Sequence, residues 1–341
     1  MAWLSLRQWA PFKIDALGLV TILGANELDL MIGSLCYNSL TEFLPLLASS
    51  IIASDQITTP IPGTTIYNIT DGIVATDIAG WLTRWLLCQD FTWNSSTLEV
   101  AIRTGGRHRR RSRVVSAIIG ITVMILVIVL TVGTYDWFGL ANALGMTVSI
   151  LVRWVVVNEN RKAIDFAVSQ GLRLSSDIVK TFWVLPNGKA ITVYAPRGVI
   201  INCFLTSPRP RLASGYLLVR IFGWISFGVH IVTLGMACLV NQLIAVAILI
   251  ISTLLTVWRI SAERFEIGSC LTFIRRDHPD PDDSRSGSYV RLQLSYAEEL
   301  CMLRWNLLPQ PSNEGWWRRY RIRQKKERMI NIRGRDRRGT V

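Results

Sequence analysis

The segment from Val114 to Gly133 runs for twenty residues without a charged side chain. As an α-helix it would be about 30 Å long, which matches the hydrocarbon core of a bilayer. Half of the 341 residues are hydrophobic and only 18% are charged, against about 25% in an average soluble chain. The sequence therefore predicts a membrane-spanning helix at 114–133, and it argues against a soluble protein.

Further apolar stretches predict three more spans. One runs from Trp137 to Val157, and the stretch 216–258 is about twice as long as one span needs to be. The polar pair Asn241-Gln242 marks the expected turn of a second helical hairpin. The predicted fold class is thus an α-helical multi-pass integral membrane protein, with four transmembrane helices in two hairpins.

The distribution of charge predicts the orientation. The net charge is +13, and the surplus lies in two segments: 107–113 holds five arginines, and 316–341 holds eleven basic residues. Basic residues flank the same end of all four predicted spans, and cytoplasmic flanks are enriched in Lys and Arg. We therefore expect 158–215 and 259–341, the C-terminus included, to be cytoplasmic. The expected location is a eukaryotic plasma membrane or endomembrane. Charge confined to two patches also argues against nucleic-acid binding.

Residues 1–106 leave two arrangements open. In the first, 30–53 crosses the bilayer outward and 73–88 returns, which would place the glycosylation sequon at Asn68 outside. In the second, the whole region is cytoplasmic or lies on the membrane, and the sequons at Asn68 and Asn94 are not used. We expect at least one membrane insertion around 30–53.

The segment between the two hairpins has a different character. We expect the second span to continue as a helix through 160–170, and Asn187-Gly188 is typical of a tight hairpin turn. Three predicted strands form a small β-meander: Thr181–Leu185, Ala190–Tyr194 and Val199–Leu205. The expected regions are 1–106, the first hairpin 107–157, the cytoplasmic helix and meander 158–215, the second hairpin 216–258 and the cytoplasmic tail 259–341.

The tail combines one predicted strand, Tyr289–Tyr296, with a helix at Ala297–Leu308 and a basic, aromatic end. Basic clusters close to a span attract anionic lipid, and Trp and Tyr favour the headgroup region. We therefore expect Trp316–Arg328 to be a helix on the cytoplasmic leaflet. The candidate lipid-binding residues are Trp316, Trp317, Arg318, Arg319, Tyr320, Arg321, Arg323, Lys325, Lys326 and Arg328. The alternative is a solvated tail that acts as a topogenic or sorting signal.

The sequence contains no P-loop, nucleophile elbow or H-E-x-x-H motif. Its six cysteines show no C-x-x-C spacing and there are only three histidines, so we expect no metal and no cofactor. His278 and Asp283 match the H-x-x-x-x-D spacing of glycerolipid acyltransferases, but they lie in a Pro-rich hydrophilic linker. We therefore expect a protein that is not an enzyme.

His230 lies near the middle of the third predicted span, where ionisable residues are rare and often functional. A hydrogen bond from a neutral imidazole to a neighbouring helix is the simpler role. Ala141, Gly145 and Ser149 lie four residues apart, a spacing that lets helices approach closely. The leading hypothesis is a non-enzymatic membrane protein whose cytoplasmic segments bind anionic lipid or partner proteins. The alternatives are a transporter or channel with a polar site at His230 and, third, a membrane-embedded transferase.

Overall fold

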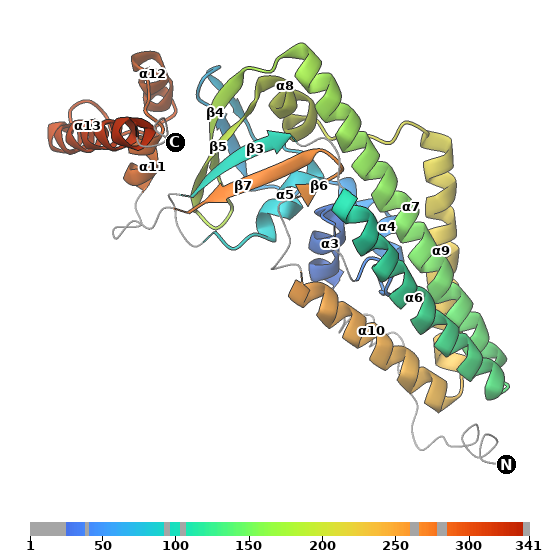
Figure 1. Cartoon of the computed structure of the whole chain (residues 1–341). Coiled ribbons are helices and arrows are strands. Elements are labelled where there is room, and N and C mark those ends of the chain that lie inside the picture. Colours follow the sequence, from blue (N-terminus) through green and yellow to red (C-terminus); the bar gives the residue numbers. More distant parts are fainter. Residues whose placement is uncertain are drawn as a thin grey trace.

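The computed structural model describes residues 25–37, 41–91, 96–102, 107–259, 266–277 and 285–336. A helical bundle joins a mixed α/β unit (Figure 1). The bundle consists of α6 (Arg107–Gly133), α7 (Trp137–Leu174), α9 (Ala213–Met236) and α10 (Leu239–Arg259). Each of these helices is long and apolar enough to cross a membrane. The four predicted apolar helices are thus confirmed.

Helix α7 connects the two parts of the molecule. Its 38 residues form one continuous helix, so the predicted span and the expected extension at 160–170 are a single element. Gly145 in α7 allows α9 to approach closely, and the Ser226 hydroxyl of α9 donates to the Gly145 carbonyl at 2.7 Å. In the second hairpin the helix break falls between Met236 and Leu239, a few residues before the expected position.

The two hairpins are tied together at the end of the bundle remote from the sheet, which we call the turn end (Figure 1). One Asp136 carboxylate oxygen accepts from the Gly139 amide at 3.0 Å and so caps the start of α7. The other accepts from the Cys238 amide at 2.8 Å and from the Asn241 side chain at 2.9 Å. A single carboxylate therefore satisfies donors at the starts of both α7 and α10.

Seven strands form one sheet: β1 (Thr65–Asn68), β2 (Ile73–Ala75), β3 (Thr97–Ile102), β4 (Ile178–Val184), β5 (Ala190–Pro196), β6 (Glu266–Ile267) and β7 (Leu271–Arg276). Their order is β2-β1-β4-β5-β3-β7-β6. All neighbours pair antiparallel except β3 and β5, which are parallel. The expected hairpin of β4 and β5 is present, and its turn residue Gly188 has a φ of 78°. Three distant stretches of chain thus build a sheet much larger than the expected meander.

The third predicted strand, Val199–Leu205, is wrong. The short helix α8 (Arg197–Val199) runs directly into the π-helical segment η2 (Ile200–Leu205). Ile200, Cys203 and Phe204 are completely buried. A spacing of three to four residues between buried side chains is that of a helix, whereas a strand would bury alternate residues.

The strand predicted in the tail, Tyr289–Tyr296, is also absent. Its first residues belong to α11 (Arg285–Arg291), and the chain then turns at Gln293, which has a φ of 47°. The expected helix after it is confirmed as α12 (Tyr296–Arg304). The expected tail helix is confirmed as α13 (Glu314–Asp336).

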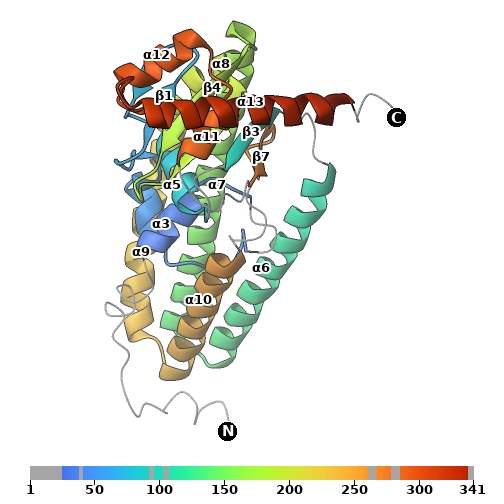
Figure 2. The same ribbon diagram turned by 90° about the vertical axis from the view of Figure 1, so that its left-hand side faces the viewer.

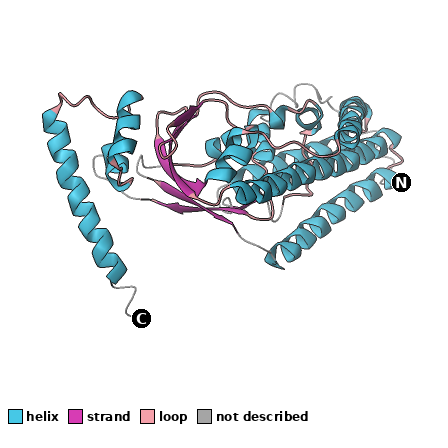
Figure 3. Cartoon of the chain, turned by 90° about the horizontal axis from the view of Figure 1, so that it is seen from above, coloured by secondary structure: helices cyan, strands magenta, loops and turns pink. Residues whose placement is uncertain are grey.

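Helices cover the sheet on both faces, in a three-layer arrangement (Figure 3). Alternate side chains of each strand point to opposite faces, so Trp183 and Phe182 enter different cores. Trp183 packs with Phe204 and with the part of α7 that extends beyond the bundle. Phe182 packs with Tyr289 of α11 and with Tyr320 of α13. The tail helices are therefore part of the folded α/β unit.

The N-terminal region forms no membrane-length helix among its described residues. Its helices are α3 (Ala25–Gly33), α4 (Ser49–Ala53) and α5 (Gly80–Leu87), and each is shorter than a span requires. The expected outward span at 30–53 and return span at 73–88 are therefore not formed; the latter divides into β2 and α5.

Asn68 belongs to the same sheet as the segment after α7. It pairs with Thr181 of β4, is 4% exposed, and its amide donates to the Asp71 carboxylate at 2.8 Å. Because β1 and β4 are hydrogen-bonded neighbours, the arrangement in which Asn68 lies across a membrane from 158–215 is excluded. Glycosylation of Asn68 stays a prediction. Asn94 lies outside the described residues.

Candidate functional site

The segment 41–53 enters the bundle although it does not cross it. Leu47 is buried in the bundle core with Met124 of α6 and Met146 of α7, and Phe43 packs against this core. A Cβ added to Gly120 of α6 would lie 2.3 Å from the Phe43 carbonyl oxygen. The irregular backbone of this segment thus lies directly against α6, at a point where only glycine fits.

Two arginines of α7 hold the start of this segment and the residues before it. Arg153 donates to the carbonyl oxygens of Glu42 at 2.8 Å and of Leu44 at 2.6 Å. Arg161 is 4% exposed, pairs with the Glu42 carboxylate and donates to the Leu35 carbonyl at 2.9 Å. Buried backbone carbonyl groups outside helices and strands need donors from elsewhere in the protein. These arginines provide those donors, so their positive charges are engaged within the protein.

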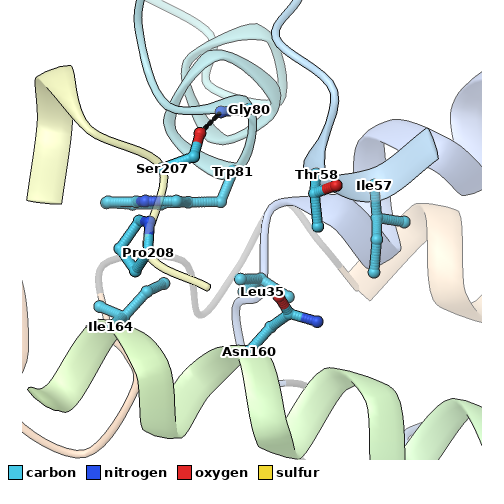
Figure 4. Close-up of a pocket in the computed structure, with 9 residues that line it drawn as sticks. All are labelled: Leu35, Ile57, Thr58, Gly80, Trp81, Asn160, Ile164, Ser207 and Pro208. Carbon is cyan, nitrogen blue, oxygen red and sulfur yellow. Dashed lines mark hydrogen bonds between the residues drawn. The ribbon is translucent and has the colours of Figure 1, made fainter. Parts of the chain in front are cut away.

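A small cavity lies between α5, α7 and the segment after η2 (Figure 4). Trp81, Ile164 and Pro208 form much of its wall. The space that the centre of a water molecule could occupy inside it is about 10 Å³. That is room for about one water molecule. The Asn160 amide on its wall donates to the Val156 carbonyl and to the Tyr216 hydroxyl. The cavity is therefore too small for a substrate.

His230 lies in α9 and faces the interior of the bundle. It is 4% exposed, and both ring nitrogens lack a hydrogen-bond partner within the described part of the chain. Asn142 of α7 is also buried, with an unpartnered side-chain oxygen. The expected hydrogen bond from His230 to a neighbouring helix is not formed. No group of three or more His, Cys, Asp and Glu residues suited to a metal ion occurs among the described residues.

The aromatic end of the tail helix points into the protein. Tyr320 is 2% exposed, and its ring stacks on that of Trp316 with the centroids 5.1 Å apart. The indole of Trp317 donates to the Gln310 carbonyl at 3.3 Å. Burial raises the pKa of the Tyr320 hydroxyl well above its usual value, and the nearby Glu299 carboxylate raises it further. The expectation that Tyr320 sits at headgroup depth is therefore wrong.

Two arginines of the predicted lipid-binding set also contact other side chains of the protein. Arg321 binds the buried Glu299 carboxylate through two nitrogens, at 2.7 and 2.6 Å. Arg328 donates to the side-chain oxygen of Gln293 at 2.7 Å. The sequence analysis missed Glu299 and Gln293 as partners. The Ser295-x-x-Glu298 capping box marks the start of α12, but nothing in the sequence identifies Glu299 as the residue that turns toward α13.

The opposite face of α13 is basic and exposed; we call it the basic face. Four of its side chains are exposed and make no ion pair within the described part of the chain: Arg318, Arg319, Lys325 and Lys326. Arg323 is exposed as well. Ile322 and Met329 lie between these charges and are 63% and 62% exposed. The structure thus divides the predicted lipid-binding set into an anchoring half and an exposed half.

His278 and Asp283 lie outside the described residues. Comparison with models of protein families, with curated proteins and with solved structures finds no match to this chain.

Proposed function

We propose that the bundle spans a membrane and that the α/β unit lies on its cytoplasmic side. The outer surfaces of α6 and α9 support this, because they expose large apolar side chains such as Ile118, Leu126 and Phe222 that bilayer lipid would cover. The basic residues Arg113, Arg209 and Arg259 lie at the sheet end of the helices, as the positive-inside rule expects of a cytoplasmic end. The proposed location is a eukaryotic plasma membrane or endomembrane.

We propose further that the protein is not an enzyme and that its cytoplasmic unit binds anionic lipid through the basic face of α13. The observation that carries this proposal is that four basic side chains on one folded helix are exposed and have no ion-pair partner among the residues that the structure describes. Each basic residue close to an anionic surface contributes about 1 kcal/mol to binding. Four such residues, with Ile322 and Met329 inserted between headgroups, would give several kcal/mol.

The test is co-sedimentation of the full chain, held in nanodiscs of neutral lipid, with vesicles. We expect binding to vesicles that contain phosphatidylserine and little binding to phosphatidylcholine vesicles. Salt should weaken binding, because the Debye length falls to about 8 Å at 0.15 M and about 3 Å at 1 M. Equal binding to both kinds of vesicle would contradict the proposal.

The variant that tests the residues replaces Arg318, Arg319, Lys325 and Lys326 with Gln. It should lose most of the binding. The matched control replaces four other exposed basic residues with Gln: Lys162, Arg173, Arg209 and Arg304. It removes the same charge and should retain most of the binding. An equal loss in both variants would mean that net charge alone, and not the basic face, attracts the vesicles.

A second candidate function, a transporter or channel, is favoured by one observation. The His230 ring is buried in the bundle with neither nitrogen hydrogen-bonded among the described residues, and buried polar groups normally have partners. If His230 carries protons or ions, the chain in liposomes should dissipate an imposed pH gradient. His230→Gln should abolish that flux, and Thr233→Ala on the next turn should not. No flux from the unaltered chain would reject this candidate.

A further inference from the structure

The basic face lies at the far end of the molecule from the turn end of the bundle. The sheet separates α13 from the bundle in two views at right angles (Figures 1 and 3). The axis of α13 also runs across the axes of the bundle helices (Figure 2). If the bundle crosses a bilayer, α13 is parallel to the plane of that bilayer, and the sheet lies between the two. The expectation that this helix lies on the leaflet beside the spans is therefore at odds with the fold.

Side-chain contacts hold α13 in this position. Tyr320 is buried in one cluster with Phe182 of the sheet, Tyr289 of α11 and Met302 of α12. The two-nitrogen contact of Arg321 with Glu299 fixes the same turn of α13 to α12. A bidentate arginine–carboxylate pair fixes direction as well as distance. Turning the helix back to the bundle's own membrane would break this cluster and expose its aromatic rings.

The packing also fixes where the exposed charges point. Tyr320 and Gln324 are buried and Glu327 is half-buried, and a spacing of three to four residues places them on the face toward the protein. Arg318, Lys325 and Met329 are spaced so that they share the opposite face. The basic face is therefore directed away from the sheet and from the bundle.

We propose that α13 binds the surface of a second anionic membrane, so that the protein bridges two bilayers. This proposal rests on the lipid binding proposed above and adds which membrane is bound. With 23 residues, α13 presents a straight surface roughly 35 Å long. Its flat placement parallel to the bundle's membrane lets all four unpaired charges reach an apposed surface together.

A lipid surface fits this face better than an acidic protein does. A helix that docks in a protein groove presents a continuous apolar stripe at positions i, i+3, i+4 and i+7. Among the side chains that the structure describes on this face, up to residue 329, the large apolar ones are Ile322 and Met329, seven residues apart, with Lys325 and Lys326 between them. Basic residues with interspersed apolar ones are typical of interfacial helices.

The test is vesicle clustering. The full chain is reconstituted into liposomes of neutral lipid, and protease cleavage of the tail in intact liposomes measures the fraction with α13 outward. Acceptor vesicles with or without phosphatidylserine are then added, and clustering is followed by light scattering. We expect clustering only with phosphatidylserine acceptors, reversal at 1 M salt, and a loss of at least tenfold for the fourfold Gln variant. The control variant at 162, 173, 209 and 304 should cluster as the unaltered chain does.

A second set of liposomes separates the two proposals. Here phosphatidylserine is placed in the membrane that holds the bundle. Clustering with anionic acceptors at physiological salt should be at least half of the clustering seen when the bundle is held in neutral lipid. If the solubilised chain sediments with anionic vesicles but fails to cluster them, the bridging proposal is overturned and lipid binding stands. If it neither sediments nor clusters, and instead binds polyglutamate through the same four residues, both proposals fail in favour of an acidic protein partner.

Discussion

Two groups of basic residues in this chain differ in their surroundings: one is buried and bound to the protein's own backbone, and the other is exposed. Arg153 and Arg161 of α7 are buried, and among the described residues their guanidinium groups donate to the protein's own segment 35–44. Arg318, Arg319, Lys325 and Lys326 of α13 are exposed and have no ion-pair partner among the described residues. The comparison shows that a basic residue near a span serves the fold where carbonyl groups converge on it. A basic residue remains available to a ligand where the opposite face of its helix makes the packing contacts with the protein.

The largest expected effect on stability is at Arg161. Arg161→Met removes the ion-pair partner of the Glu42 carboxylate and the donor to the Leu35 and Cys36 carbonyl groups. Breaking a buried ion pair from one side costs about 3–5 kcal/mol. The measurement is the free energy of unfolding on transfer from mild detergent into SDS. Lys162→Met, next to it but 63% exposed at the side chain, should change that free energy by less than about 1 kcal/mol.

An intermediate effect is expected at the turn end, at Asp136. Burial raises the pKa of this carboxyl, but hydrogen bonds from Gly139, Asn241 and Cys238 outweigh it, so the folded pKa lies below the usual value. The stabilisation is therefore present at neutral pH and is lost as pH falls through the folded pKa. Asp136→Asn should cost about 1.5–3 kcal/mol at pH 7.

The same variant tests the pH dependence. Between pH 7 and pH 3 the unaltered chain should lose more unfolding free energy than Asp136→Asn does, since Asn does not titrate. Parallel pH profiles for the two proteins would exclude Asp136 as the link between the hairpins.

A smaller effect tests whether segment 41–53 lies inside the bundle. Gly120→Val places new atoms against the Phe43 carbonyl, and such overpacking costs about 1–3 kcal/mol. Gly228→Ala in α9 is the control, because an added Cβ there meets nothing within 4 Å. It should be neutral, or stabilising by up to about 1 kcal/mol through helix propensity. Equal tolerance at both glycines would place the segment elsewhere.

The smallest effect on stability is expected for the four basic residues of α13. Replacing Arg318, Arg319, Lys325 and Lys326 with Gln breaks no ion pair among the described residues, so the unfolding free energy should stay within about 0.5 kcal/mol. The same variant is expected to lose lipid binding. A large loss of stability would mean that these side chains resemble Arg161 in function after all.

The sequence predicted the elements whose cause is local. Twenty apolar residues are enough to specify α6, and Asn187-Gly188 specifies the β4–β5 turn without help from distant residues. The rest of the sheet depends on long-range pairing: β3 lies beside β5 and β7, with Thr97 opposite both Thr192 and Arg276. Short strands of this kind resemble loops until their partners are known.

The candidate site was predicted in part for the same reason. Composition identified Trp316–Arg328 as a basic, aromatic helix. Which side of it is exposed depends on Glu299 and Tyr289, which the sequence does not place near Tyr320. The buried roles of Arg153 and Arg161 depend on carbonyl groups more than a hundred residues away, which no local pattern reveals.

The central claim is that the exposed face of α13 contacts anionic lipid, and oxidation of Met329 tests it most directly. Met329 is 62% exposed on that face, whereas Met302 of α12 is completely buried and provides an internal control. The chain in nanodiscs of neutral lipid is exposed to hydroxyl radicals with and without phosphatidylserine vesicles, and sulfoxide formation is measured by mass spectrometry. The account predicts that these vesicles slow Met329 oxidation several-fold, that phosphatidylcholine vesicles do not, and that Met302 is unaffected. An unchanged rate at Met329 while phosphatidylserine vesicles are present in excess would contradict it.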